Sequence, residues 1–528
     1  MAKAATTGRI TEVRARMYCL GTGDCFVYKF YSGRTHRFTM MVDCGSCQGT
    51  KDDFLPYLED LATYVDNTID LLVITHEHND HVNGFHKCPE IFENKKMTIR
   101  EAWFAWTEHP DDPGGRAKDL QEKKKKMKHA FSNALAAIKS KAGDIETNLS
   151  GDKNKVRALN NHDAFVTGLN TLADVNLGVA GNPLPGMTAI KNILEVKKTK
   201  IQYLEPGATI KISKLPGLKF HILGPPFDTE SVYKHEKEGT DVFQKNKKSG
   251  FSFGDFSMAI NAFSSIGTEA GEKDIPFHDR YLVPKEEQQS RQMSIQTTIM
   301  RQTTYNEEKQ KPAVTDQINK ATRDLYFADG NEWRKIDLDW LNSAGSLALR
   351  LNSHINNTSL VLAIESEGPG NKVMLLPGDA EFGSWQSWYA IEKWKKKGRN
   401  EKHLVEDLLN RTVFYKVSHH LSYNGTALDL GFNKMESDEL VAMATLDRKR
   451  IAKKWKGTMP NKKLLNELIK KCKGKVFMMN EFDVRDAPGK TLPRASLPKT
   501  EFESLEEFDQ KKYPGKKGPV YLQYNVKL

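Results

Sequence analysis

The sequence predicts an α/β protein whose functional site lies where several strands end. Three short apolar runs, the first of them rich in β-branched residues, have the length of buried strands, and polar residues follow each of them at once. These runs are Ile69–Thr75, Lys372–Pro377 and Thr412–Val417. Charged segments with helical character occur between the first two runs. Because α/β folds place their sites at the ends of strands, the polar residues after the runs are expected to lie close together.

The motif that follows the first run is His76–His81, with the sequence His-Glu-His-Asn-Asp-His. On an extended chain His76 and His78 point the same way, and a turn after them would bring Asp80 and His81 back toward the same space. Neutral imidazoles with a carboxylate are the ligands that zinc and similar divalent metals prefer. The motif therefore predicts a metal site rather than a solvated polar loop.

Two later strand ends supply further ligands. Gly378 permits a tight turn that would hold the Asp379 carboxylate at the sheet edge, and His419 and His420 follow the third run. Because neighbouring residues on a strand point to opposite faces, only one of these two histidines can bind a metal directly. We favour His419 as the ligand and His420 as the residue that donates protons or orients the ligand. The reverse assignment stays open.

The order of these motifs resembles that of the metallo-β-lactamase superfamily, and within it the hydrolase domain of the DNA-uptake protein ComEC. The resemblance covers residues of about 15–85 and 345–430, and it is closest to large stand-alone bacterial members. The matching segments are Gly23-Asp24, Val42–Gly45, His76–His81, Leu223–Pro226, Asn356–Leu362, Leu376–Asp379 and Lys416–Ser422. The fold implied is a metallo-β-lactamase αββα sandwich with a large, partly helical insertion.

The resemblance also implies a site for two divalent ions, with zinc the expected metal and manganese or iron the alternatives. The first two histidines of the cluster would bind one ion, the last two residues of the cluster the other, and the aspartate after the second run would bridge them. The expected ligands are His76, His78, Asp80, His81, Asp379 and His419. Asp80 and His420 are the expected catalytic residues. Asp43 would anchor the metal loop from behind, although an aspartate beside Gly45 is also typical of an ordinary turn.

Two departures from the family pattern stand out. Leu421 occupies the position of a glycine that usually follows the paired histidines, and it is expected to narrow the mouth of the pocket. Many members also carry an extra histidine between the first cluster and the bridging aspartate. His221, in the expected strand Leu218–Leu223, is the best-placed candidate. The alternatives are that His221 is an ordinary strand histidine and that water completes the first ion's shell.

Two ions about 3.5–4 Å apart would turn a bridging water into a hydroxide nucleophile, so that no protein nucleophile is required. The sequence indeed contains no Gly-x-Ser-x-Gly elbow. Hydrolysis is therefore the expected reaction, and a phosphodiester in nucleic acid is the leading substrate. A lactone, thioester or peptide bond on the same ions is the competing reaction class. A metal-bearing interaction module that never turns over is the third alternative.

The charge balance favours an acidic partner. The 528-residue chain has 79 Lys and Arg against 68 Asp and Glu, a formal net charge of +11, and such an excess favours nucleic acid. The basic runs lie at 123–128 and 453–475, where they either bind phosphate or form solvated helix faces. Six cysteines without the density of a disulfide framework, no long apolar span and no signal peptide predict a cytoplasmic protein that does not enter a membrane.

The chain is expected to divide into four segments. Residues 9–108 form the first half of the metallo-β-lactamase domain, 109–330 an insertion or cap with some returning strands, 331–430 the second half, and 431–528 a C-terminal extension. Within the insertion, Glu286–Gln292 would be a mobile cap or linker. Because stand-alone members also occur beside anti-phage defence genes, the resemblance permits a role in defence, with a partner protein from the same operon.

Overall fold

A computed structural model describes residues 8–149, 169–170, 172–177, 184–234, 241, 339–394, 403–451, 459–480 and 490–528. The chain forms two compact units. The first comprises residues 1–128, 149–249 and 349–528, and the second comprises 129–148 and 250–348. The predicted linker Glu286–Gln292 and the basic run at 453–456 lie outside the described residues.

The first unit contains an eight-stranded sheet with the order β14-β15-β1-β2-β3-β4-β5-β6. Neighbouring strands from β14 to β3 in this order pair antiparallel, whereas β3, β4, β5 and β6 run parallel. The strands are β1 Glu12–Tyr18, β2 Phe26–Ser32, β3 Thr35–Val42, β4 Thr68–Val73, β5 Thr98–Ala105, β6 Lys200–Leu204, β14 Phe502–Leu505 and β15 Tyr521–Lys527.

The same unit contains a seven-stranded sheet with the order β13-β12-β11-β10-β9-β8-β7. Strands β10 to β13 run parallel, and β7 to β10 pair antiparallel. The strands are β7 Thr209–Ile210, β8 Leu218–Gly224, β9 Val361–Ser366, β10 Val373–Leu376, β11 Thr412–Lys416, β12 Val441–Ala444 and β13 Val476–Met478. The predicted strands at residues 69–75, 218–223, 372–377 and 412–417 therefore correspond to β4, β8, β10 and β11.

The second sheet is buried on both faces, and alternate residues of one strand enter different cores. In β9, Leu362 and Ile364 join the core that the two sheets share, whereas Val361 and Ala363 join a core with the outer helices. Strands β10 and β12 alternate in the same way. Two sheets packed face to face, with helices outside them, form the predicted αββα sandwich.

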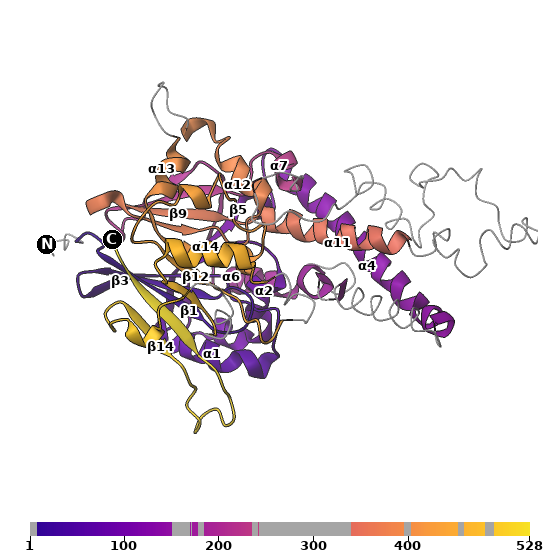
Figure 1. Ribbon diagram of the computed structural model, residues 1–528, viewed down its shortest axis with the longest axis horizontal. Coiled ribbons are helices and arrows are strands. Elements are labelled where there is room, and N and C mark those ends of the chain that lie inside the picture. Colours follow the sequence, from indigo (N-terminus) through magenta and orange to yellow (C-terminus); the bar gives the residue numbers. More distant parts are fainter. Residues whose placement is uncertain are drawn as a thin grey trace, which may run out of the picture. The chain divides into compact units, whose positions relative to one another are not determined.

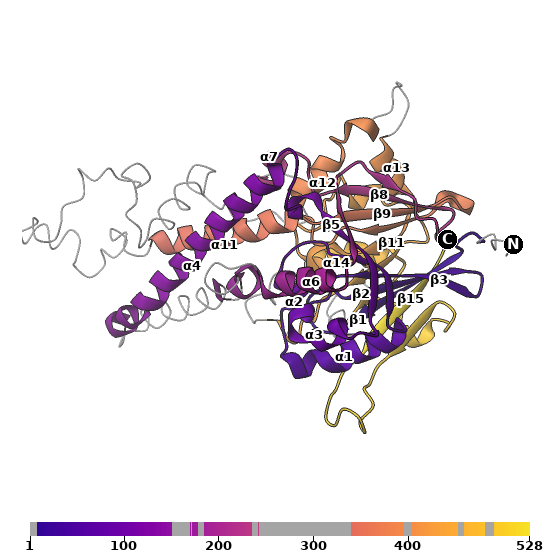
Figure 2. The same cartoon turned by 180° about the vertical axis from the view of Figure 1, so that it is seen from behind.

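Helices cover the outer face of each sheet. Figures 1 and 2 show α1 and α3 on the side of β1 and β2, and α12 and α13 on the side of β8 and β9. Helices that lie wholly within the described part of this unit include α1 Lys51–Tyr64, α2 Asn79–Lys87, α3 Pro89–Glu93, α6 Pro185–Val196, α7 Thr229–Tyr233, α12 Phe382–Trp388, α13 Leu404–Asn410 and α14 Lys462–Lys471. Short 3₁₀ turns lie at Trp106–Glu108, Pro369–Asn371, Glu392–Trp394, Ser418–Leu421, Phe432–Lys434 and Arg494–Ser496.

Among the described residues of the second unit are parts of two long helices. Helix α4, Arg116–Leu149, belongs to the second unit from His129, and α11, Asp339–Asn357, belongs to it as far as Ala348. The beginning of α4 and the end of α11 belong to the first unit. None of the described helices is both long enough and apolar enough to cross a bilayer.

Parts of the chain outside the two expected catalytic halves complete the sandwich. Within the insertion, β6 joins the first sheet and β7 and β8 join the second. The segment 431–528, predicted as an extension, supplies β12 and β13 to the second sheet and β14 and β15 to the first. Strand β15 pairs with β1 along its whole length, from Glu12 opposite Lys527 to Tyr18 opposite Tyr521.

Candidate metal centre

Parallel strands from both sheets end beside one another, and each end carries a polar residue. Asp43 follows β3, and His76 follows β4 after two residues. Asp379 follows β10, His420 follows β11, and Thr445 follows β12. These residues meet, as residues at the carboxyl ends of parallel strands do; Thr445 Oγ1, for example, lies 2.9 Å from His420 Nδ1.

The loop that carries the first histidines is held tightly by its neighbours. Backbone bonds join Asp24 N to Asp80 O at 3.0 Å and Cys44 N to His81 O at 2.7 Å. A Cβ on Gly45 would overlap the Asp80 backbone, so a glycine is needed at this close approach. His78 is the N-cap of α2, which begins at Asn79, and the helix start turns the chain so that Asp80 and His81 face inward.

Four buried side chains form the centre of the site. The potential ligand atoms of Asp80, His81, Asp379 and His420 all lie within 4.8 Å of one another. The Nε2 atoms of His81 and His420 each lie 3.1 Å from Asp379 Oδ2, and His420 Nε2 lies 3.1 Å from Asp80 Oδ2. Two imidazole nitrogens and two carboxylates that converge in this way fit a divalent transition metal.

His76 and His78 converge beside this cluster. His76 Nε2 lies 3.0 Å from His78 Nδ1, and the ring of His76 lies 4.1 Å from that of His81. Two nitrogens bound to one tetrahedral zinc ion at 2.0–2.1 Å would be about 3.3 Å apart. The pair therefore has the spacing of two ligands of a single ion.

Two buried atoms of the cluster have no hydrogen-bond partner among the described residues, which also fits a metal. Asp80 Oδ1 and His81 Nε2 are both buried without one; His81 Nε2 is close to Asp379, but the contact is not a hydrogen bond. Buried polar atoms are nearly always satisfied, so open ones at a ligand cluster point to an ion. The donor set and its geometry fit the predicted divalent metal.

The electrostatics separate the histidines into two kinds. Burial lowers the pKa of His76, and it lowers the pKa of His78 to about 4, so both rings are neutral with a lone pair available. Burial also opposes charge on His81 and His420, but the carboxylates, Asp379 first, raise the pKa of His81 well above its usual value and that of His420 to about 9. In the metal-free protein these two rings carry positive charge that a bound cation would replace.

Asp43 lies directly behind His81. Its Oδ2 is 2.8 Å from His81 Nδ1 and accepts from the Thr75 hydroxyl, while its Oδ1 accepts from the Thr75 backbone nitrogen. A carboxylate on the far nitrogen of an imidazole fixes the ring so that the other nitrogen faces the metal. Asp43 thus contacts His81 through the ring nitrogen that faces away from Asp379.

Lys416 is a residue at the site that sequence reasoning missed. Its ammonium group is buried and contacts Asp379 Oδ1 at 3.1 Å, Gly378 O at 2.9 Å and Asp24. Burial opposes the charge, but Asp24 and Asp379 raise the pKa of Lys416 above its usual value. One signal was present in the sequence, because a lysine inside an otherwise apolar strand needs a buried acidic partner.

The paired histidines differ from the expectation. They do not lie on a strand: β11 ends at Lys416, and His419 and His420 have φ values of +46° and +50° in the turn that follows. Alternation along a strand therefore cannot decide which of the two histidines faces the cluster. His420 faces Asp80 and Asp379, whereas His419 Nδ1 lies 2.8 Å from Ser422 Oγ and 3.2 Å from Glu381 Oε1. The structure brings His420, and not His419, into the cluster.

His221 and Leu421 also lie elsewhere than expected. Both ring nitrogens of His221 are engaged by other residues, Nε2 with Glu365 and Nδ1 with Thr209, each at 3.0 Å, and His221 is not part of the cluster. Leu421 is buried in the core between the second sheet and its helices, so its side chain does not narrow a pocket mouth. Its φ of +63° is a conformation in which glycine is the usual residue.

The insertion contacts the metal loop through Glu77, another residue not singled out from the sequence. Its carboxylate pairs with Lys128 at 2.6 Å and with Lys124 at 3.0 Å, and Lys124 also lies 3.3 Å from Glu108. All four groups are buried. Burial would raise the pKa of Glu77, but the two lysines hold it well below its usual value. Two of the five lysines of the basic run in α4, Lys124 and Lys128, are therefore structural.

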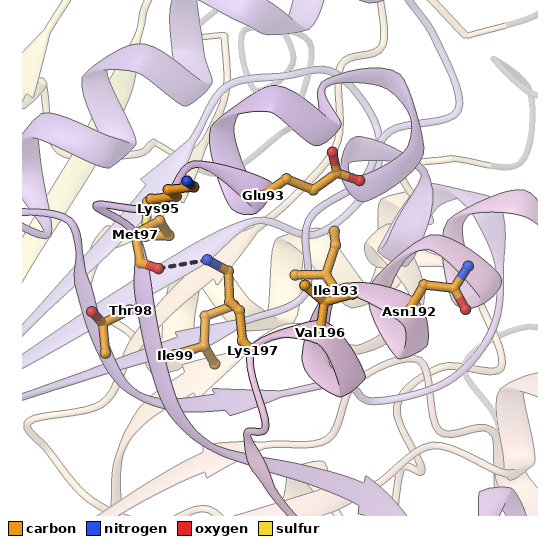
Figure 3. Close-up of a pocket in the computed structure, with 9 residues that line it drawn as sticks. All are labelled: Glu93, Lys95, Met97, Thr98, Ile99, Asn192, Ile193, Val196 and Lys197. Carbon is orange, nitrogen blue, oxygen red and sulfur yellow. Dashed lines mark hydrogen bonds between the residues drawn. The ribbon is translucent and has the colours of Figure 1, made fainter.

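A cavity of about 620 Å³ lies away from the cluster (Figure 3). Thr98 at the start of β5 lines the cavity and pairs with Thr68 at the start of β4. The metal loop follows the other end of β4, so the cavity and the metal loop lie at opposite ends of these strands. Lys197 crosses it to donate to Met97 O at 2.7 Å. The cavity lining includes no histidine or cysteine, and its residues are Glu93, Lys95, Met97, Thr98, Ile99, Asn192, Ile193, Val196 and Lys197.

Comparison with known families agrees with this geometry. Residues 21–191 match the family model described as "Metallo-beta-lactamase superfamily". The matched range includes Asp24, Asp43 and the whole cluster from His76 to His81. No curated protein matches the chain. The match and the two-sheet architecture together show a metallo-β-lactamase-fold domain, and members of that superfamily are generally metal-dependent hydrolases; no subgroup within it is indicated.

Proposed function

We propose that this protein is a two-metal hydrolase that cleaves phosphodiester bonds in nucleic acid. The observation that carries the hydrolase assignment is the buried cluster of Asp80, His81, Asp379 and His420 with His76 and His78 beside it. The superfamily match supports the same reaction class. The substrate class rests on the charge of the chain and on its resemblance to the ComEC hydrolase domain.

The residues fall into two ligand groups that share Asp379. His76 Nε2 and His78 Nδ1 would hold one ion. Asp80, His81 Nε2, His420 Nε2 and Asp379 Oδ2 would hold the other. We propose that the Asp379 carboxylate also serves the first ion. Zinc fits the nitrogen-rich donor set best, with manganese or iron as alternatives. Bound there, such ions would acidify a water molecule and polarise the oxygens of the scissile group.

Other residues of the chain orient this machinery. Asp43 fixes the His81 ring, and Lys416 holds Asp379 Oδ1 so that Oδ2 faces the histidines. The His419 backbone N–H donates to Asp379 Oδ1 at 3.2 Å, and its side chain is 18% exposed. We assign proton transfer to the leaving oxygen to His419 rather than to His420, because His420 is engaged by two carboxylates of the cluster.

Exposed lysines support nucleic acid as the substrate. In α4, Lys123, Lys125 and Lys126 are exposed, whereas Lys124 and Lys128 are buried against Glu77. The helix thus offers a basic face on the same element that contacts the metal loop, and phosphate contacts of this kind supply most non-specific affinity for nucleic acid. A role in anti-phage defence with a protein partner is the biological setting that we propose for this activity.

The test compares substrates on one metal-loaded preparation. DNA, RNA, a chromogenic phosphodiester and a chromogenic lactone are each incubated with the native protein, with Asp379→Ala and with the control His221→Gln. We expect phosphodiester cleavage that Asp379→Ala abolishes and His221→Gln retains. Turnover of the lactone alone would replace the proposal by the competing reaction class. No turnover at full metal occupancy would identify a non-catalytic metal-bearing module.

A further inference from the structure

Within the motif His76–His81, the side chains of Glu77 and Asn79 contact residues of the insertion. In the motif His76–His81 the ligand atoms point inward, while Glu77 pairs with lysines of α4. Asn79 Nδ2 donates to the backbone oxygen of Asp174 at 2.5 Å. The far ring nitrogen of His78, Nε2, lies 2.9 Å from Asn176 Oδ1. A short helical segment at 172–176, within the insertion, thus lies directly against the metal loop.

Asn176 is placed so that its amide can have only one orientation. It is fully buried, and its Nδ2 donates to Leu172 O at 2.7 Å and to Asn352 Oδ1 at 3.1 Å. Both partners are oxygens that accept hydrogen bonds, so they select the amide nitrogen on that side. The opposite side of the amide must therefore be Oδ1, and it faces His78.

An acceptor at this place determines the tautomer of His78. Because Asn176 Oδ1 can only accept, His78 Nε2 must carry the hydrogen of the neutral ring. The other nitrogen, Nδ1, then has the free lone pair, and it is Nδ1 that lies 3.0 Å from His76 Nε2. The hydrogen bond at one ring nitrogen decides which nitrogen is available to a metal.

We propose that Asn176 is a positioning residue of the metal centre, which holds His78 as the Nε2–H tautomer and so presents Nδ1 to the ion shared with His76. This inference rests on the metal site of the proposed function and is independent of the substrate. The insertion then contributes to the metal centre itself, because a residue nearly a hundred positions after the motif sets the ligand atom.

The first test measures metal affinity by competition with a chromogenic chelator. Asn176→Leu removes the acceptor at similar volume, and we expect the weaker of two binding steps to lose affinity by about 10–100-fold. The matched control is Asn525→Leu, which removes another buried asparagine that bonds to Thr500 O and Gln523 and lies on β15. Equal affinities in native protein and Asn176→Leu would overturn the proposal, as would an equal loss in both variants.

The second test first reads the native protein, so its main result does not depend on a variant that folds. Selective nitrogen-15 labelling of histidine reports, for each ring, which nitrogen carries hydrogen and which binds metal. We expect one metal-loaded histidine with a protonated Nε2 and a metal-bound Nδ1, and its signal should shift in Asn176→Leu. If every metal-bound histidine coordinates through Nε2, the inference fails. If the native protein binds no metal at all, it is the proposed function that fails.

Discussion

At the scale of single residues, His419 and His420 carry different tasks although they are neighbours in a left-handed turn. Each of these non-glycine residues has a positive φ, a conformation that costs roughly 1–2 kcal/mol per residue. Such strain persists where the surrounding contacts over-determine it and is common at functional sites. Here it is compensated by the contacts of His420 with Asp80 and Asp379, and of His419 with Ser422 and Glu381.

This division of tasks predicts opposite effects of two alanine variants. His420→Ala should lower the metal content, since it removes an atom of the cluster. His419→Ala should leave the metal content unchanged and slow turnover by about 10²–10⁴-fold, as expected for the loss of a proton donor. Elemental analysis and steady-state rates measure the two effects. Equal loss of metal in both variants would refute the division.

A buried histidine outside the metal cluster predicts how stability depends on pH. His354, in the last turn of α11, has no hydrogen-bond partner at either ring nitrogen within the described part of the chain. Burial first, and then the nearby Lys124, lowers the pKa of His354 to about 3. The folded protein therefore binds fewer protons than the unfolded chain between a pH of about 6.5 and about 3, and the contribution of His354 to stability is lost as the pH falls through that window.

Replacing His354 by Leu should remove this contribution. The urea midpoints of unfolding of the native and variant proteins are measured with a chelator present. Above a pH of about 6.5 the difference between the two midpoints should be constant, because His354 is then neutral in both the folded and the unfolded chain. Below that pH the native protein should lose stability more steeply than His354→Leu. The metal-binding histidines are common to both proteins and cancel in the comparison. Parallel curves across the whole range would show that His354 does not titrate as the geometry requires.

At the scale of elements, the contact between α4 and the metal loop is a buried ion network. Glu77→Gln would leave Lys128 without a charged partner and weaken the hold on Lys124. Breaking a buried pair by removal of one partner costs about 3–5 kcal/mol. The matched control is Glu467→Gln, which removes an exposed pair with Lys470 on α14 and should cost less than about 1 kcal/mol. Chemical unfolding of the metal-free proteins measures both values, and similar values would contradict the network's structural role.

The same helix predicts how nucleic-acid binding responds to salt. The triple variant Lys123→Gln, Lys125→Gln and Lys126→Gln removes exposed charges and spares the buried lysines. The slope of log affinity against log salt should flatten by about 0.7–0.9 for each phosphate that the variant no longer neutralises. Cleavage of a small chromogenic phosphodiester should be unchanged, which serves as the internal control. An unchanged slope would identify these lysines as an ordinary solvated face.

At the scale of the whole molecule, the candidate ligands connect the two sheets of the first unit. The cluster His76–His81 follows β4 of the first sheet, whereas Asp379 and His420 follow β10 and β11 of the second. An ion that binds only the folded protein adds about 2.7 kcal/mol of stability at a free concentration one hundred times its Kd. Its loss should therefore be visible in thermal unfolding.

Removal of metal should lower the melting temperature of the native protein. Zinc added back after chelation should raise the melting temperature again, by an amount that grows with the logarithm of the free zinc concentration. Asp379→Ala should show a much smaller shift, because both ligand groups share this carboxylate, while His221→Gln should shift like the native protein. Calorimetry measures all three. If neither chelator nor zinc changes the melting temperature of the native protein, metal binding does not stabilise the fold and the prediction is wrong.

Part of this architecture could be predicted from local sequence. The runs before His76, Asp379 and His419 are strands because apolar, β-branched residues bury well in a sheet. The tight turn at Gly378 was also predictable, and this residue has a φ of +59° in the structure. The residue types of the ligands suffice to predict a divalent metal, and the motif order suffices to predict the sandwich that the family match and the two sheets show.

What the sequence determined by itself was the kind of chemistry, because ligand type and strand periodicity are local properties. Tertiary structure decided which atoms meet. A left-handed turn selected His420 over His419, a pairing with Glu365 kept His221 away, and Lys416 found two acidic partners across the sheet. Asn176 reached His78 across 98 positions of chain. These choices depend on packing between segments far apart in sequence, whose geometry no local pattern encodes, and only folding brings them within hydrogen-bond distance.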